Sequence, residues 1–322
     1  MPSIHILIDT QESGGNASYS HQILLSLLRE AGITDYSLQS ILPPLREAEY
    51  ICTKKDLTSP TTVQLGQGKY LATKWTEAYL TIQQDLLTNP CNLILTLGPL
   101  AASMTSPESL DSIRGTTYIS PLCKKKTLST YSHIIMTKIW HTRPVILADL
   151  LKAAANSSTP ALTRVRREIW THPTLADLEI VFSRLLESPV LSIDIETSHG
   201  QITCIGFSPS PYFAVVIPFV SMLSPDLSYW SEEEEVIVWN WVKKVCLLPN
   251  TKVLQNGLYD IQWLWKKAGI TLGGEIHDTM LLHHAQQPEM EKSLGFLGSV
   301  YAEESSWKTM RNNKTDTTKR DE

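Results

Sequence analysis

Two carboxylates that stand two residues apart at the end of an apolar segment are the residues best suited to do chemistry. Asp194 and Glu196 lie in the run Val190-Leu-Ser-Ile-Asp-Ile-Glu-Thr197. If this run is a strand, both side chains project from the same face of a sheet. A carboxylate in an otherwise buried strand is costly unless it is paired or bound to a metal. Hard divalent ions take oxygen ligands, and two of them can hold the attacking and leaving oxygens of a phosphodiester. The pair therefore points to metal-dependent phosphoryl chemistry.

A third carboxylate follows in the segment Asn256-Gly-Leu-Tyr-Asp260. A short strand over residues 252–254 leads into it. Apolar residues then recur at helical spacing as far as Ala268, and Gly269 favours a helix stop. Asn256 and Asp260 therefore share one face of the first turns of a predicted helix.

Three strands and a further helix are predicted around the first pair. The strands cover residues 190–197, 201–208 and 212–219, with turn residues at 198–200 and 209–211. Asp194 and Glu196 therefore lie on the first strand of an antiparallel meander. The helix covers residues 231–244, because Ser231 and Glu234 have capping-box spacing and lysines stand near its end.

The segment from about Leu175 to Trp307 resembles the DEDD superfamily of 3′-to-5′ exonucleases, in the form found as the proofreading domain of family A DNA polymerases, especially those of phages. Asp194-Ile-Glu196-Thr matches the first motif of that family. Asn256-x-x-x-Asp260, with Tyr259 beside the acid, matches the second, and His277-Asp-Thr-Met-Leu-Leu282 matches the segment after it.

The resemblance implies an RNase H-like α/β domain with a mixed sheet and helices. It implies that Asp194, Glu196 and Asp260 are catalytic residues that bind two Mg²⁺ or Mn²⁺ ions, which activate a water to release nucleoside monophosphates. Asn256, Thr197 and Tyr259 are then expected to contact the substrate. The expected partners are the 3′ ends of single-stranded DNA. A DNA polymerase domain, downstream in the same chain or in trans, would make this a proofreading or trimming activity in DNA replication.

The third motif of the family, Tyr-x-x-x-Asp or His-x-x-x-Asp, has no match. Tyr301 is followed four residues later by Ser305 rather than Asp. Asp316 and Asp321 stand in a polar, charge-mixed tail that we interpret as solvated. We therefore expect a fragment of a longer protein, inactive in this form if it lacks the fourth carboxylate.

The neighbouring histidines and Asp278 are expected to be structural. Mg²⁺ and Mn²⁺ select oxygen ligands, so we interpret His277, His283 and His284 as residues of the helix and its edge. Asp278 is expected to cap the next helix.

The length of 322 residues suggests two domains. The predicted domains are residues 1–155 and 173–322, the second incomplete at its C-terminus, joined by a linker over residues 156–172 in which small and polar residues are frequent. In the first domain, apolar strands over residues 4–9 and 92–97 alternate with predicted helices, which favours a parallel α/β sheet. The helices are expected over residues 19–31, 74–87 and 143–155.

The first domain resembles the C-terminal part of the uracil-DNA glycosylase superfamily. The resemblance rests, in order, on segments that begin at Leu97, Ile113, Thr130 and Arg143. It implies a parallel α/β sandwich with a possible vestigial glycosylase site at Gly98, Arg114 and His133. The catalytic pattern is degraded, because residues 9–15 match the acidic loop of that family poorly. Its Thr-x-His-Pro signature would place His at Ser132 and Pro at His133.

The cysteine content and the apolar runs of the sequence indicate the cellular compartment of the protein. The chain has five scattered cysteines and no Cys-x-x-Cys pair, so no iron–sulfur cluster is expected and a reducing cytosol is favoured. No signal peptide is recognised at Met1, and the longest apolar run, residues 213–223, is too short to span a bilayer. We expect no membrane partner and a cytoplasmic location, in a bacterial cell or a phage-infected host.

Two alternatives remain beside the exonuclease. The first is a catalytically incomplete nucleic-acid-binding module, and the second is a base-excision enzyme that acts through the first domain. The formal net charge of −5 gives no support for nucleic acid. The basic clusters at residues 124–126 and 164–167 are solvated faces or a phosphate track. Six aromatic residues could include a base-stacking platform or could belong to the core: Tyr229, Trp230, Trp239, Trp241, Trp263 and Trp265.

Overall fold

A computed structural model describes residues 3–10, 17–45, 47–53, 63–66, 69–224, 227–302 and 304. The chain forms two compact units. The first comprises Met1–Thr163 together with Glu289–Glu322, and the second comprises Arg164–Pro288. The second unit is therefore inserted in the sequence of the first. This differs from the predicted division, which kept everything after residue 173 in one domain. Within the described ranges, no helix is both long and apolar enough to cross a membrane.

The first unit contains a five-stranded sheet in the order β2-β1-β6-β8-β7. The strands are β1 (Ile4–Thr10), β2 (Tyr36–Leu42), β6 (Leu93–Leu97), β7 (Thr117–Ile119) and β8 (Lys126–Thr130). All neighbours are parallel except β7, which runs antiparallel to β8. The predicted parallel α/β sheet is confirmed, whereas the glycosylase likeness stays a prediction.

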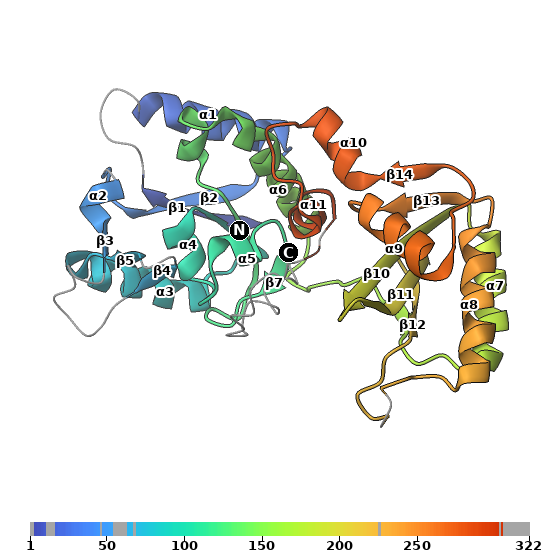
Figure 1. The fold of residues 1–322 in the computed structure, drawn as a ribbon. Coiled ribbons are helices and arrows are strands. Elements are labelled where there is room, and N and C mark those ends of the chain that lie inside the picture. Colours follow the sequence, from blue (N-terminus) through green and yellow to red (C-terminus); the bar gives the residue numbers. More distant parts are fainter. Residues whose placement is uncertain are drawn as a thin grey trace. The chain divides into compact units, whose positions relative to one another are not determined.

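Helices cover both faces of this sheet (Figure 1). On one face α1 (Ala17–Glu30) and α6 (Arg143–Asn156) pack against side chains such as Ile6. On the other face α3 (Thr76–Thr88) and α4 (Pro99–Ser103) pack against Leu7 and its neighbours. Alternate residues of a strand point to opposite faces, so a strand covered on both faces is buried throughout, as β1 is.

The remaining elements of the first unit are short. They are α2 (Glu47–Tyr50), α5 (Leu110–Ile113), α11 (Leu294–Tyr301), and a small antiparallel sheet of β3 (Ile51–Thr53), β5 (Lys69–Leu71) and β4 (Gln64–Gly66). Among the described residues of this unit, 3₁₀ segments cover Thr73–Trp75, His133–Thr137 and Trp140–Thr142. Helix α11 contacts α6, so the chain returns to the first unit after leaving the second.

The second unit is built on a six-stranded sheet in the order β14-β13-β10-β11-β12-β9. The strands are β9 (Glu168–Trp170), β10 (Val190–Ser198), β11 (Gln201–Ser210), β12 (Phe213–Pro218), β13 (Thr251–Leu254) and β14 (Ile276–Asp278). The meander β10-β11-β12 is antiparallel, and β13 and β14 extend it in parallel from β10. This mixed sheet is consistent with the predicted RNase H-like fold. Strand β9, which pairs with β12, lies where we predicted a linker.

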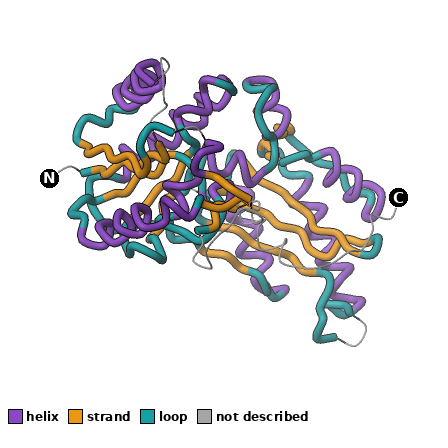
Figure 2. Tube along the Cα trace, turned by 90° about the vertical axis from the view of Figure 1, so that its left-hand side faces the viewer, coloured by secondary structure: helices purple, strands orange, loops and turns teal. Residues whose placement is uncertain are grey.

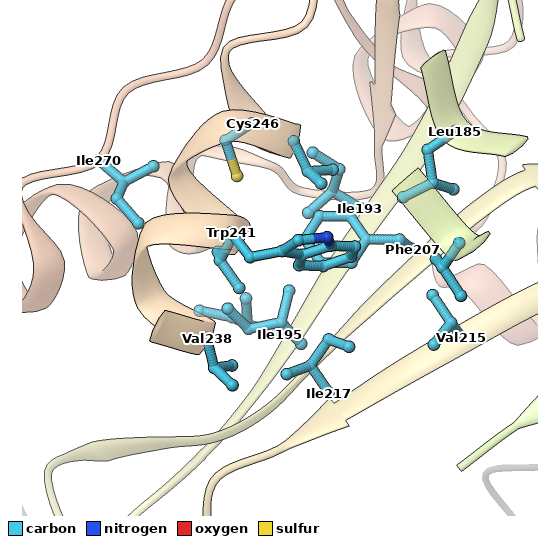
Figure 3. Packing of buried hydrophobic residues seen from close by; sticks show 14 of the residues in the cluster. Leu185, Ile193, Ile195, Phe207, Val215, Ile217, Val238, Trp241, Cys246 and Ile270 are labelled. Atoms are coloured by element: carbon cyan, nitrogen blue, oxygen red, sulfur yellow. The ribbon is translucent and has the colours of Figure 1, made fainter. Parts of the chain in front are cut away.

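Helices α7 (Leu175–Glu187) and α8 (Glu232–Cys246) lie side by side and cover one face of this sheet. Both begin with the capping box, at Thr174 and at Ser231, the latter as predicted. Trp241 of α8 packs edge-on against Phe207 at 5.8 Å between ring centroids, and donates its indole N–H to Leu178 O at 3.0 Å. Figure 3 shows these rings surrounded by aliphatic side chains. Trp241 is therefore a core residue.

Helix α9 (Leu258–Ala268) follows β13, and α10 (Thr279–Gln286) follows β14. Gly269 ends α9 in the left-handed conformation with a φ of 62°, as its position in the sequence predicts. Figure 2 distinguishes the helices, strands and loops of the chain by colour. The parallel strands β13 and β14 are thus each followed by a helix. Because β13 pairs with β10, the helix after β13 places the second motif beside the first.

Candidate active site

Strand β10 presents the first two carboxylates on its exposed face. Ile193 and Ile195 are buried, whereas Asp194 and Glu196 are exposed, in the alternation expected of a strand with one covered face. The pairing of β10 with β11 shifts register between Glu196 and Thr197. Such irregularities change the direction of the side chains near them. The predicted placement of Asp194 and Glu196 on one face is confirmed.

Helix α9 brings the third carboxylate to the same strand. The backbone N–H of Ile195, the residue between the first two acids, donates to Asp260 Oδ1 at 2.9 Å. Asp260 is only 3% exposed. Burial, the largest cause, and the negative charge of Asp194 together raise the pKa of Asp260 to about 6, although the hydrogen bond from Ile195 N–H opposes both effects. Asp260 is therefore close enough to Asp194, from which it is far apart in sequence, to interact with it electrostatically.

Asp278 holds the turn that carries Asp260. Its carboxylate accepts hydrogen bonds from the backbone N–H groups of Asn256 at 3.1 Å and Gly257 at 2.8 Å. It also caps α10, as predicted, by accepting from Met280 N at 2.9 Å. The sequence indicated the cap but not the link to the second motif, because that link joins residues about twenty positions apart. Asp278 is thus a positioning residue that sequence reasoning missed.

Asn256 and Gly257 meet the conformational demands of this turn. Asn256 has a φ of 58°, in the left-handed region that asparagine tolerates better than most residues. A Cβ on Gly257 would lie 2.6 Å from the Cβ of Leu254, so only glycine fits there without a shift. The structure therefore gives Asn256 a role in the turn. Its predicted contact with substrate stays a prediction.

Thr197 and Tyr259 join the two motifs a second time. Their hydroxyl oxygens lie 2.5 Å apart and share a hydrogen bond between β10 and α9. The Tyr259 side chain remains 45% exposed. Both residues therefore lie beside the carboxylates and are open to solvent, as their predicted substrate-binding role requires. That role itself stays a prediction.

The donor set suits a hard divalent cation, although the ligands are not gathered in a closed cluster. In the described part of the chain, no group of three or more His, Cys, Asp or Glu side chains has the arrangement of a metal site. Asp194, Glu196 and Asp260 nevertheless offer only carboxylate oxygens, which Mg²⁺ and Mn²⁺ prefer. Asp316 and Asp321, which we interpreted as part of a solvated tail, lie outside the described residues.

Cys204 is the one sulfur beside these acids in the described part of the sheet. It lies opposite Glu196 in the pairing of β11 with β10. Burial raises the pKa of the Cys204 thiol, and the charges of Glu196 and Asp194 raise it further. A neutral thiol is a poor metal ligand, because the thiolate is the form that binds metal. In the metal-free protein, the Cys204 thiol is therefore harder to deprotonate than an ordinary cysteine.

The nearby histidines have surroundings that fit the predicted structural roles. His277 Nε2 lies 3.4 Å from Glu275 Oε2 at the surface, and His283 is buried within α10. His284 follows it in the same helix. These three residues belong to β14 and α10 rather than to β10 and α9, which carry the acids.

In the first unit, Arg114 has a structural role. Its guanidinium donates to both oxygens of Asp149, at 3.1 and 3.0 Å, and to the hydroxyl of Ser299 in α11. Arg114 is 3% exposed and Asp149 is fully buried. Thr130 also donates to Asp149, at 2.6 Å. The guanidinium of Arg114 is thus occupied by a buried ion pair, and the predicted vestigial role of Arg114 in a glycosylase site stays a prediction.

Gly98 and His133, the other two predicted residues, have separate surroundings. Gly98 has a φ of 111°, and a Cβ there would lie 2.5 Å from Asp9 Oδ2, so the glycine allows a close approach to Asp9. His133 is buried, and burial, followed by the charge of His21, lowers its pKa to about 4. Its Nδ1 is buried without a hydrogen-bond partner among the described residues. A neutral, buried imidazole fits packing, and a vestigial role for both residues stays a prediction.

Comparisons with known proteins give fold-level likenesses. No protein-family model matches the chain, and no curated protein matches it. Among solved structures, the Nibbler EXO domain of Aedes aegypti is 14% identical with a TM-score of 0.36, and the match covers 50% of this chain and 81% of that one. RNase D of Escherichia coli, an exoribonuclease involved in structured RNA processing, is 16% identical with a TM-score of 0.35, over 46% of this chain and 36% of that one.

The catalytic core of RRP6 from Trypanosoma brucei is 19% identical with a TM-score of 0.36, over 48% of this chain and 40% of that one. The chain thus spans less than half the length of the RNase D and RRP6 structures it matches. All three scores are low, so we base the functional assignment on the carboxylates and their geometry.

Proposed function

We propose that this chain carries a metal-dependent exonuclease domain that removes nucleotides from the 3′ ends of single-stranded nucleic acid. One observation carries the proposal. Asp260 is bonded to the backbone N–H of Ile195, between Asp194 and Glu196, and the charge of Asp194 contributes to the raised pKa of Asp260. Carboxylates that repel one another, as Asp194 and Asp260 do, are stabilised by a cation, and the motifs that supply Asp194, Glu196 and Asp260 occur in the order of the exonuclease family.

Each residue of the site has a distinct task. Asp194 and Glu196 offer exposed oxygens, and Asp260 offers a buried one, so these three residues would hold Mg²⁺ or Mn²⁺, expected as two ions. Bound ions would polarise the phosphodiester and provide the Lewis acid for its hydrolysis. Thr197 and Tyr259, with solvent-accessible hydroxyls beside the acids, would contact the terminal nucleotide.

The finer proposal concerns the biological setting. The sequence resemblance to proofreading domains supports single-stranded DNA as substrate, a DNA polymerase downstream or in trans as partner, and the cytoplasm of a bacterium or phage-infected host as location. RNA is the competing substrate, because RNase D is an exoribonuclease. Matched DNA and RNA strands of the same base sequence would decide between them.

The test is digestion of a 5′-labelled single strand with Mg²⁺ or Mn²⁺, with the 322-residue chain and with a version extended along its reading frame. We expect stepwise shortening from the 3′ end and release of nucleoside monophosphates. Glu196→Gln should abolish it, whereas Glu179→Gln, at an exposed position of α7, should not. If neither form shortens the strand, or if Glu196→Gln digests it at the wild-type rate, the proposal is wrong.

A second candidate function is a binding module without catalysis. The absence of an Asp four residues after Tyr301 favours it, because the family takes its last carboxylate from that position. Binding of single strands in EDTA, with no product from either form of the chain after metal is added, would support this alternative.

A further inference from the structure

A stripe of side chains runs along α9 away from the carboxylates. Tyr259, Trp263 and Lys267 are spaced four residues apart, so they share one face of the helix. The ring centroids of Tyr259 and Trp263 are 6.1 Å apart, and Lys267 Nζ lies 5.6 Å from the centroid of the Trp263 ring. The three side chains thus form a continuous aromatic and basic surface, which we call the α9 stripe.

The α9 stripe begins at the candidate active site. The hydroxyl of Tyr259 is bonded to Thr197, the residue next to Glu196. Tyr259 is also the residue directly before Asp260 in the sequence.

The other end of the α9 stripe reaches a cavity of about 330 Å³. Lys267 lines it together with Gln201, Phe219, Glu235 and Trp239. The rings of Phe219 and Trp239 are stacked, with centroids 4.2 Å apart and planes 16° from parallel. Glu235 is the acid of this wall, and it accepts a hydrogen bond from the indole of Trp239 at 3.1 Å. The stripe therefore connects the carboxylates to a cavity that has an aromatic wall.

We propose that the α9 stripe and this cavity bind the nucleotides that precede the 3′-terminal one, in a single strand whose end lies at the carboxylates. The inference rests on the proposed function and adds a path for the substrate. A rise of about 1.5 Å per residue makes the stripe from Tyr259 to Lys267 about 12 Å long. At about 3.4 Å per stacked nucleotide, this length accommodates about three nucleotides.

The chemistry of the stripe fits a nucleic acid strand. Aromatic side chains stack on bases of any sequence, and lysine neutralises phosphates. The exposed ammonium of Lys267 lies over the ring of Trp263 in a contact that is weak at a surface, so a base and a phosphate can take its place. Trp265, which is 61% exposed, stands two residues from Trp263 and hence on a different face of α9.

The first test compares two lysines of the same helical turn. Fluorescence anisotropy with 5′-fluorescein oligothymidylates of two to eight nucleotides, in EDTA, gives the affinity for each length. We expect affinity to rise up to about four nucleotides, one at the acids and about three on the stripe. Lys267→Gln should weaken binding of the longer strands about three- to tenfold and lower the salt slope by about 0.7. Lys266→Gln should bind like the wild-type chain.

The second test compares two tryptophans. Trp263→Leu should weaken binding about fivefold to a hundredfold, in proportion to the loss of one stacked base, whereas Trp265→Leu should not. Trp263 is partly packed against the core, so circular dichroism must first show that the Trp263→Leu variant is folded. If Trp263→Leu does not fold, Lys267→Gln still tests the proposal, because Lys267 is exposed and its substitution should not disturb the fold.

The binding and digestion assays distinguish a wrong α9 stripe proposal from a wrong exonuclease proposal. Without metal, Glu179→Gln, at an exposed position of α7, should bind single strands as the wild-type chain does, because the stripe is intact. If the wild-type chain digests strands but Lys267→Gln and Lys266→Gln bind equally, the path is wrong and the exonuclease stands. If the wild-type chain binds no strand of any length in EDTA, the path is also wrong, whatever the digestion assay shows.

Discussion

Replacing Asp260 by Asn removes a buried negative charge whose cost can be worked out from the structure. Burial, with a contribution from Asp194, raises the pKa of Asp260 from 3.8 to about 6. At about 1.36 kcal/mol per pKa unit, the charged form costs the folded, metal-free protein about 3 kcal/mol. From about pH 4 to about pH 6 the folded state keeps a proton that the unfolded state has released, so the free energy of unfolding falls as the pH rises. Asn at this position can still accept the bond from Ile195.

We therefore expect Asp260→Asn to be more stable than the wild-type chain by up to about 3 kcal/mol at pH 8, and equal to it below about pH 4. Urea unfolding in EDTA, followed by tryptophan fluorescence at several pH values, measures this difference. Asp177→Asn is a control that should be less stable than the wild-type chain. Hydrogen bonds from Thr174 lower the pKa of Asp177, so its negative charge stabilises the fold. A wild-type chain that is as stable as Asp260→Asn at pH 8 would refute the reasoning.

Two further predictions concern the turn at Gly257 and the ion pair of Arg114 with Asp149. Gly257→Ala should destabilise the second unit by about 1–3 kcal/mol, because the new Cβ would meet Leu254, whereas Gly206→Ala should change stability little, since its nearest neighbour would be at 3.8 Å. Urea unfolding of both variants checks this, and equal stabilities would contradict it. Arg114→Ala should cost about 3–5 kcal/mol by leaving Asp149 buried without its partner, whereas the double replacement Arg114→Met with Asp149→Leu should cost much less. A single variant as stable as the wild-type chain in thermal unfolding would show that this pair is not buried as described.

The elements that hold the first motif could be predicted because their signals are local. The alternation of Asp194 and Glu196 with apolar residues, the capping box at Ser231 and the helix stop at Gly269 each depend on residues a few positions apart. Such patterns reflect the periods of strand and helix and the hydrogen-bonding needs of helix ends. The approach of Asp260 to the same strand came from the motif resemblance and agrees with the bond to Ile195.

The features that could not be predicted depend on contacts between distant residues. Strand β9 has three residues and no periodicity, and it forms because β12 offers an edge to pair with. Asp278 holds the turn at Asn256 from about twenty residues away. Helix α11 contacts the first unit through residues far apart in sequence, such as Ser299, which bonds to Arg114. No residue spacing in the sequence predicts these contacts, because only the tertiary structure brings the partner residues together.

The most direct test of the central claim is the affinity for Mn²⁺, measured from the electron paramagnetic resonance signal of the free ion. We predict that Asp194→Asn, Glu196→Gln and Asp260→Asn each weaken Mn²⁺ binding by about tenfold or more, because each removes an oxygen ligand from one shared site. Glu179→Gln should bind Mn²⁺ like the wild-type chain. If all three substitutions leave the affinity unchanged, these carboxylates do not form a metal site, and the exonuclease assignment is contradicted.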